Sequence, residues 1–194
     1  GVLACQYPFI ARMDTDDIAK NDRFEKQIDA FCANPKLSLV GGWIEEFSSA
    51  PNEITAIRTV PLLHQEIVCY AKHRNPINHM TVMFRKQAVL EVGNYLPMPL
   101  LEDYYLWYRL IEKGFLLHNL SDILVSVRAG KGMIDRRGGF QYWQSERTLQ
   151  RIFLASGFIS RKEYIQNIIL RFLVRMLPTI VREFLYRKFL RKSI

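Results

Sequence analysis

The sequence predicts an α/β protein in which a sheet is flanked by helices and followed by a C-terminal amphipathic helical tail. Short apolar runs typical of strands alternate with segments whose apolar residues recur at helical spacing. Of the 194 residues, 49% are apolar and 24% charged, which is enough to bury one substantial core. The three cysteines form neither a CxxC pair nor a zinc-ligand spacing, and no apolar run reaches the roughly 18 residues of a membrane span.

Turn and cap residues divide the first half of the chain. Asn21 or Asp22 can cap a helix with one apolar face, and Asn34-Pro35 ends it. Pro61 suits the first turn of a second helix, and Gly93 terminates a third. The elements expected here are a strand at 9–11, a helix at 22–33, a strand at 37–40 that resumes at 43–47 after Gly41-Gly42, an edge strand at 54–60, a helix at 62–73, a strand at 77–85 and a helix at 86–92.

The second half is predicted to hold two short strands between helices. In YYLWYRLIEKG, Leu106, Trp107 and Leu110 recur at helical spacing, and Gly114 ends that helix. The segment RAGKGMIDRRGG is a loop rich in glycine and arginine. The elements expected here are the helix at 104–113, strands at 115–117 and 123–127, the loop at 128–139 and a helix from 140 to about 156.

Three carboxylates stand within four positions after the first predicted strand: Asp14, Asp16 and Asp17, in YPFIARMDTDDIAKNDRF. A buried strand that ends in such a cluster is costly unless a cation or solvent shares the charge. Oxygen coordination of Mg²⁺ or Mn²⁺, completed by a substrate phosphate, is the chemistry that suits it. A turn followed by a helix cap would explain the same residues, because Asp is favoured at both.

A second acidic pair, Glu102-Asp103, opens the helix at 104–113. With both acidic motifs, the chain resembles the C-terminal two-thirds of a family 2 glycosyltransferase of the GT-A fold, of the type that builds bacterial O-antigen and capsule. Four blocks carry the resemblance in family order: IARMDTDDIAKNDRFEKQ, NPINHMTVMFRKQAVLEVGNY, LEDYYLWYRLIEKG and RAGKGMIDRRGG. It implies a partial, Rossmann-like mixed sheet in a catalytic unit at 1–157, a tail at 158–194, and a nucleotide-binding half before Gly1.

The resemblance also implies roles for both acidic motifs. Asp14-Thr15-Asp16 would be the DxD motif, with Asp16 binding the Mn²⁺ or Mg²⁺ that bridges the donor diphosphate and Asp14 near the ribose and the metal shell. Asp103, beside Glu102, would be the general base for an acceptor hydroxyl, in a single in-line displacement that inverts the anomeric configuration. From the residues alone, Glu102 and Asp103 equally complement the dipole of the helix that they open.

Further candidates for substrate contact come from the strand at 77–85, the helix at 104–113 and the arginine-rich loop. Asn78 and His79 would lie beside the site, although a histidine satisfied by a backbone carbonyl is the alternative. Trp107 could stack on a sugar or pack in the core. The loop could close over the diphosphate or remain a solvated basic loop. Its arginines are Arg128, Arg136 and Arg137.

The net charge of +8 is concentrated in residues 161–194, where nine Lys and Arg face two Glu, leaving 18 basic and 17 acidic residues in 1–160. A neutral body argues against nucleic-acid binding, whereas a basic tail suits an anionic surface. On a helix, Arg171, Arg175 and Arg182 share one side, and Pro178 separates a second helical piece that reaches Lys192. Two interpretations stay open: an interfacial helix on a membrane, or a helix packed on the catalytic body or a neighbouring subunit.

Together these features predict an inverting, metal-dependent glycosyltransferase of surface polysaccharide synthesis. It would move a hexose from a nucleotide sugar, with UDP-hexose the expected donor, to a lipid-linked saccharide acceptor. It would be cytoplasmic and peripheral on the inner face of the bacterial plasma membrane, and whether it forms a homo-oligomer is left open. The alternative is a catalytically incomplete membrane-binding or scaffolding module, because the 194 residues alone are expected to be inactive. A phosphoryl transferase or nuclease is disfavoured, since no P-loop and no second ordered carboxylate cluster occurs.

Overall fold

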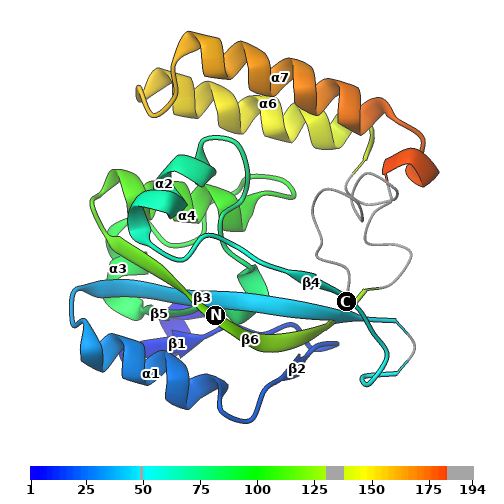
Figure 1. Cartoon of the computed structure of the whole chain (residues 1–194). Helices are drawn as coiled ribbons and strands as arrows, with labels where there is room; N and C mark the ends of the chain where they lie inside the picture. The colour runs from blue at the N-terminus through cyan, green and yellow to red at the C-terminus, as the bar shows by residue number, and fades with distance from the viewer. Residues whose placement is uncertain (49, 130–137, 183–194) are drawn as a thin grey trace.

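A mixed sheet of six strands forms the centre of the computed structural model, which describes residues 1–48, 50–129 and 138–182 (Figure 1). The strands lie in the order β1 (Phe9–Ala11), β5 (Met83–Arg85), β3 (Leu37–Phe47), β6 (Leu116–Arg128) and β2 (Ile18–Ala19), and β4 (Ile54–Arg58) pairs with the second half of β3. β3 and β6 run parallel, and the other pairs are antiparallel. This sheet with its flanking helices confirms the predicted fold class.

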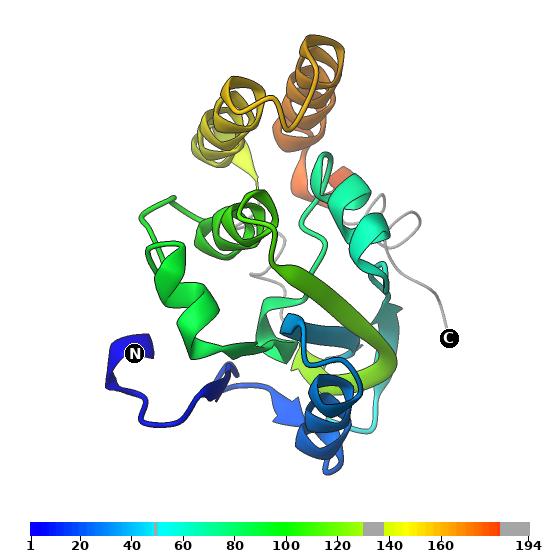
Figure 2. The ribbon, with the colours of Figure 1, turned by 90° about the vertical axis from the view of Figure 1, so that its left-hand side faces the viewer.

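Helices cover both faces of the sheet, and a helix pair forms an outer layer (Figure 2). Of the described helices, α1 (Arg23–Ala33) covers one face, and its Phe31 packs against Leu37, Val40 and Met83 of the sheet. The opposite face carries α2 (His64–Ala71), α3 (Lys86–Glu91) and α4 (Glu102–Glu112). The outer layer is the pair α6 (Gly139–Ala155) and α7 (Arg161–Met176). Short 3₁₀ turns, η1 (Val2–Ala4) and η2 (His79–Thr81), precede β1 and β5.

α4 lies between two cores, which explains why its sequence is apolar on more than one side. Toward the sheet, Leu106, Trp107 and Leu110 pack with residues of β3, β5 and α3. Toward the outer helices, Tyr104 and Tyr108 join a second core, whose other members include Leu149, Phe153 and Phe158. The helix therefore couples the sheet to the α6–α7 pair.

Three strand predictions were wrong. β3 runs through Gly41-Gly42 without a break, because only glycine fits where Asn119 and Leu124 of β6 approach the strand. The predicted strand at 77–85 is a 3₁₀ turn followed by the short β5. The two runs at 115–117 and 123–127 are one strand, β6, with register shifts against β3, and β2 was not predicted.

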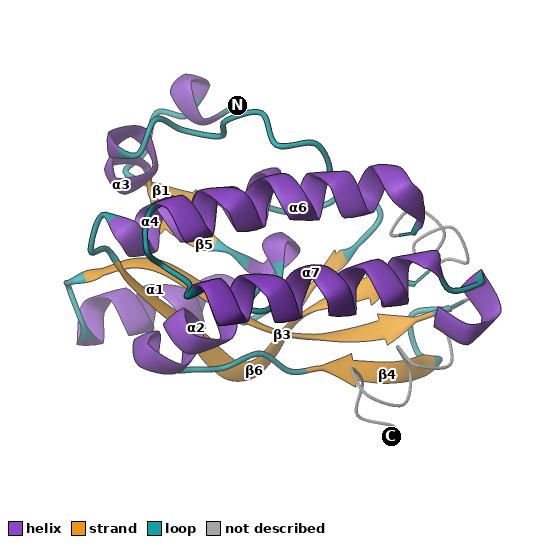
Figure 3. Ribbon diagram, turned by 90° about the horizontal axis from the view of Figure 1, so that it is seen from above, coloured by secondary structure: helices purple, strands orange, loops and turns teal. Residues whose placement is uncertain are grey.

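The tail forms an antiparallel helical hairpin with α6, and the two helices lie side by side across the sheet (Figure 3). Arg171 and Arg175 point inward and bind Glu146 of α6, so the interpretation of a helix packed on the body holds for 161–176. The second helical piece predicted to reach Lys192 extends beyond the described residues. Among the described residues, no helix has both the length and the apolar character needed to cross a membrane.

Candidate active site

The acidic segment from Arg12 to Asp17 crosses one end of the sheet. It connects β1 to β2, which are the two edge strands of the sheet. The N–H of Arg12 donates to the carbonyl of Val82 at 2.9 Å, beside the start of β5. Asp17 Oδ1 accepts from the backbone N–H of Arg128, at the end of β6, at 3.1 Å. The segment is thus fixed at both ends over the strand termini.

A buried arginine supports this segment from below. Arg23, on the first turn of α1, is 1% exposed and donates to the carbonyls of Arg12 (2.8 Å) and Val82 (3.3 Å). Its Nε donates to Gln27, whose amide in turn donates to the carbonyl of Val40 at 2.7 Å. Burial lowers the pKa of Arg23 to about 10, so it stays a cation at neutral pH. Sequence reasoning missed this pair, although two polar residues four apart on an inward helix face are a readable signal.

The carboxylates of the segment differ in their surroundings. Asp14 is ion-paired with Arg12, with Nη1 and Oδ2 2.8 Å apart, and Asp16 is exposed. Burial raises the pKa of Asp17, and its Oδ2 is buried without a hydrogen-bond partner among the described residues. No three His, Cys, Asp or Glu side chains of the described chain gather as a preformed metal site. The oxygen donors of Asp14 and Asp16 fit a hard cation that takes one or two protein carboxylates and completes its shell with phosphate and water.

The second acidic pair stands at the N-terminus of α4. Asp103 Oδ2 accepts from Asn75 Nδ2 at 2.7 Å, and its Oδ1 accepts from the backbone N–H of Tyr104 at 2.7 Å. Glu102 is exposed. Leu100, two residues before it, has a φ of 68°, a left-handed conformation that is strained for leucine. Asp103 is therefore held in one orientation by a side chain that the sequence analysis did not single out, since Asn75 stood there only as the first residue of the block NPINHMTVMFRKQAVLEVGNY.

His79 lies between the two acidic motifs. Burial lowers its pKa most strongly; the charges of Asp103, Asp14 and Glu102 act in the opposite direction, and that of Arg12 lowers it further. The geometry places both motifs near this imidazole: Arg12, which is ion-paired with Asp14, lines the same cavity as His79, and Trp107, one helical turn after Asp103 on α4, meets the His79 ring.

Tyr95 and Trp107 complete the surroundings of the imidazole. His79 Nε2 and the hydroxyl of Tyr95 lie 3.0 Å apart, and the Trp107 ring meets the imidazole edge-on at 5.8 Å. Burial raises the pKa of Tyr95 to about 12, so it remains a neutral hydrogen-bonding group. A cavity of about 360 Å³ opens beside them, within the usual size of ligand pockets. Its polar lining includes Arg12, His79, Asn94 and Tyr95.

Two of the predicted substrate contacts lie in the core. Trp107 and Asn78 are both 0% exposed, and Asn78 donates to the carbonyl of Gly42 at 2.8 Å. Neither side chain is exposed here: Trp107 packs in the core, which was the alternative given for it, and substrate contact by Asn78 stays a prediction. Arg128 is exposed and lies over the ring of Phe47 at 4.9 Å. The remaining loop candidates, Arg136 and Arg137, fall outside the described residues.

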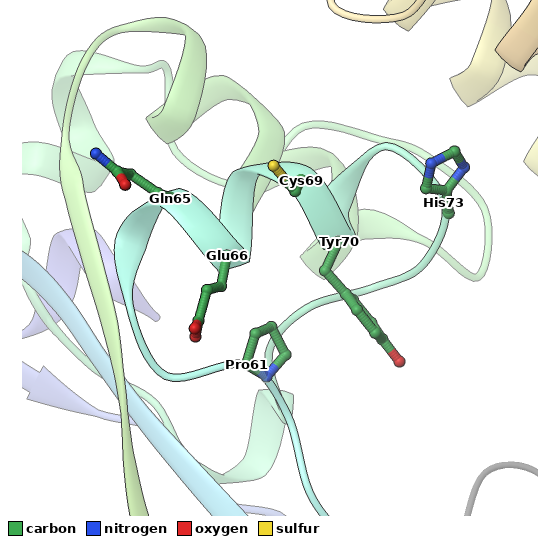
Figure 4. A pocket seen from close by; sticks show the side chains of 6 residues that line it. All are labelled: Pro61, Gln65, Glu66, Cys69, Tyr70 and His73. Carbon is green, nitrogen blue, oxygen red and sulfur yellow. The ribbon is translucent and has the colours of Figure 1, made fainter.

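A second, larger hollow of about 590 Å³ runs along α2, and its lining contains none of the predicted site residues (Figure 4). Its lining comes from one helix and the segments that flank it: Pro61, Gln65, Glu66, Cys69, Tyr70 and His73. It is wide and shallow, and it brings together no carboxylate cluster. The site with convergent chemistry is the one at His79.

Three curated relatives match nearly the whole chain. An uncharacterized glycosyltransferase of Haemophilus influenzae is 43% identical over 99% of this chain and 71% of its own length. The amylovoran biosynthesis glycosyltransferase AmsE of Erwinia amylovora is 39% identical over 97% of this chain and 70% of its own length. An Escherichia coli UDP-Gal:alpha-D-GlcNAc-diphosphoundecaprenol beta-1,3-galactosyltransferase is 36% identical over 100% of this chain and 70% of its own length.

The fold is also similar to that of a solved structure. The crystal structure of S. aureus TarS superposes with a TM-score of 0.54 and 16% identity, over 97% of this chain and 30% of that one. No protein-family model matches the chain. The relatives are glycosyltransferases, two of them with names that specify a polysaccharide or a lipid-linked sugar, and the matches cover nearly all of this chain. On this evidence the chain belongs to the glycosyltransferases.

Proposed function

We propose that this chain carries the metal and acceptor side of an inverting, metal-dependent glycosyltransferase of the GT-A type, family 2. It transfers a hexose from UDP-hexose to a saccharide on a polyprenyl diphosphate lipid, in surface polysaccharide synthesis. The observation that carries the proposal is that both acidic motifs lie beside one cavity: Arg12, which is ion-paired with Asp14, lines it together with His79, and Trp107, one helical turn after Asp103, meets the His79 ring. The name of the galactosyltransferase relative, with its UDP-linked donor and diphosphoundecaprenol-linked acceptor, supports the substrate classes.

At the donor end, Asp16 and Asp14 would hold Mn²⁺ or Mg²⁺ together with the donor diphosphate. The metal supplies Lewis-acid stabilisation of the charge that develops on the leaving diphosphate. Asp16 is exposed and free to reach such a cation. Arg12, ion-paired with Asp14, and the buried Arg23 beneath it add positive charge on the same side. This positive charge favours an anionic leaving group such as a nucleoside diphosphate over a neutral one.

At the acceptor end, Asp103 takes the proton of the attacking hydroxyl. That oxygen forms the new bond to the anomeric carbon from the face opposite the diphosphate, whose bond to the same carbon breaks, so the configuration inverts. Asn75 donates to Asp103 Oδ2 and fixes the carboxylate in its orientation. The neutral imidazole of His79, paired with Tyr95, presents a hydrogen-bonding edge to the cavity rather than a charge.

Two substitutions in the full-length enzyme test the two ends of the site separately: Asp16→Asn tests the donor end and Asp103→Asn the acceptor end. The assay measures transfer from UDP-galactose to a short-chain GlcNAc-diphosphate lipid, with UDP binding followed by titration calorimetry in Mn²⁺. Asp103→Asn should lower kcat about 10²–10⁴-fold with UDP binding intact, as expected for loss of a general base. Asp16→Asn should weaken metal-dependent UDP binding as well as transfer. The exposed Glu91→Gln on α3 is the matched control. Near-normal turnover by Asp103→Asn would refute the base assignment.

A further inference from the structure

In the hairpin of α6 and α7, the polar face of α7 points toward the body and its apolar face points toward solvent, the reverse of an ordinary surface helix. The face of α7 that meets the body is polar: Asn167 bonds Gln150 at 2.8 Å, and Arg171 and Arg175 bind the buried Glu146. Its solvent face is apolar. The exposed side chains on it, each 40–58% accessible, are Ile165, Ile169, Phe172, Leu173 and Met176. A contiguous apolar patch of this kind on a helix marks an interaction surface.

An aromatic group extends the patch onto α6. Phe140, which is 55% exposed, lies 5.4 Å from the ring of Trp143, and Trp143 meets Phe172 of α7 edge-on at 5.3 Å. The indole N–H of Trp143 already donates to the carbonyl of Ile168. Aromatic side chains with a satisfied polar atom are suited to the boundary between lipid headgroups and acyl chains.

The free charges of the hairpin are all positive. Between 139 and 176 the chain has two acidic residues, and both are engaged: Glu146 is 1% exposed between two arginines, and Glu163 caps the helix at Ser160. Four further cations of the hairpin are exposed or partly exposed, and one of them, Arg147, lies over the ring of Trp143 at 5.6 Å. They are Arg147, Arg151, Arg161 and Lys162.

We propose that this outer face of α6–α7, defined by the five apolar residues of α7, the aromatic group and the four cations, docks on an anionic lipid bilayer. Apolar side chains with only cations around them match a negatively charged membrane surface. A second copy of the chain is a poorer occupant, because a two-fold contact through this face would bring like charges together. The aromatic end of the hairpin and the end of β6 lie on the same side of the molecule (Figure 1). Docking would hold the enzyme at the membrane that carries its proposed lipid-linked acceptor, and to this extent the inference rests on the proposed function.

The test is co-sedimentation of the full-length protein with vesicles. Phosphatidylglycerol and phosphatidylethanolamine at 1:3 form the anionic set, and phosphatidylcholine alone forms the neutral set. Ile169→Gln with Leu173→Gln should lower binding to anionic vesicles at least about tenfold, because two half-exposed apolar side chains no longer leave water. Leu63→Gln, an equally exposed leucine at the start of α2, is the control and should bind like the wild type. Lys162→Glu with Arg151→Glu should reduce binding to anionic but not to neutral vesicles, and added salt should act in the same way.

An assay of sugar transfer to a water-soluble, short-chain acceptor tests the proposed function without membrane binding, so the two proposals can fail independently. The Ile169→Gln, Leu173→Gln protein should melt like the wild type and retain that transfer while losing vesicle binding. Vesicle binding that survives the double substitution, or a wild type that does not sediment with anionic vesicles, would overturn the docking surface. So would a dimer in light scattering that the same substitutions dissociate. An enzyme that binds vesicles but transfers no sugar would instead count against the proposed function alone.

Discussion

The buried carboxylate between α6 and α7 provides the sharpest test of how the tail is packed. Glu146 is 1% exposed, and its oxygens accept from Arg171 Nη1 at 2.5 Å and from Arg175 Nη2 and Nε at 2.7 and 3.0 Å. The perturbation is Glu146→Gln, which keeps the size and shape of the side chain but removes its charge. Two guanidinium groups, 12% and 16% exposed, then lie in the hairpin without their counter-charge.

Removing one partner of a buried ion pair costs about 3–5 kcal/mol. Here the lower end is expected, because Arg171 keeps its bond to the carbonyl of His73 at 2.6 Å and Arg175 stays over the ring of Tyr142 at 4.4 Å. A loss of about 3 kcal/mol corresponds to a fall in Tm of roughly 6–12 °C for a chain of this size. Thermal melts by circular dichroism, with urea unfolding as a second measure, give the change.

A triple variant, Glu146→Leu with Arg171→Met and Arg175→Leu, serves as the matched control. It removes all the charges together and leaves no guanidinium unpaired, so its stability should lie near or above that of the wild type. If Glu146→Gln melts within 2 °C of the wild type, the arginines do not depend on Glu146. The inward orientation of the basic face of α7 would then be refuted.

Three further outcomes are expected. Asn75→Ala should lower kcat about tenfold with KM little changed, because Asp103 loses the donor that orients it, while Asn75→Gln should recover part of the loss. Burial lowers the pKa of His64, whose neutral Nδ1 accepts from the N–H of Leu117 at 3.2 Å. The unfolded state therefore binds more protons than the folded state below about pH 6.5, and the free energy of unfolding should fall there. Urea unfolding at pH 7.5 and 5.5 would measure this fall, which should be smaller in His64→Gln. Gly41→Ala should lower urea stability by about 1–3 kcal/mol, since its Cβ would overlap a side chain of β6; an unchanged midpoint would contradict the close approach.

Local signals were enough to locate the helices. Caps, prolines and glycines, together with apolar spacing, predicted α1, α4 and α6 to within a few residues. They failed where the deciding partner is remote in sequence. The two residues of β2 form a strand only because Ser126 and Val125 pair with them, and no local pattern in Ile18-Ala19 predicts this pairing. Gly41-Gly42 signals a break when read locally, whereas in the sheet it marks a close approach.

The sequence drew attention to the acidic residues of the candidate site but not to the groups that support them. Asp14, Asp16 and Asp103 stand in acidic clusters that turns and helix caps would also explain, and only the resemblance to a glycosyltransferase family gave them roles, which stay predictions. Asn75 and Arg23 act on groups 28 and 59 positions away, so their partners could not be read from the sequence. The orientation of α7 was unpredictable for the same reason, because its basic face turns inward to pair with Glu146, which lies on another helix.

α4 connects the candidate active site to the α6–α7 hairpin. Asp103 lies in its first turn, and the next residue, Tyr104, is buried with its hydroxyl donating to the carbonyl of Ala71 at 2.5 Å and its ring against Phe153 of α6. The helix is packed on both sides, so it cannot shift without opening one of two cores. The carboxylate proposed as base is therefore positioned by the same helix that supports the hairpin. Contacts made by the outer face of α6–α7 act on a rigid support of the active site rather than on a loose appendage.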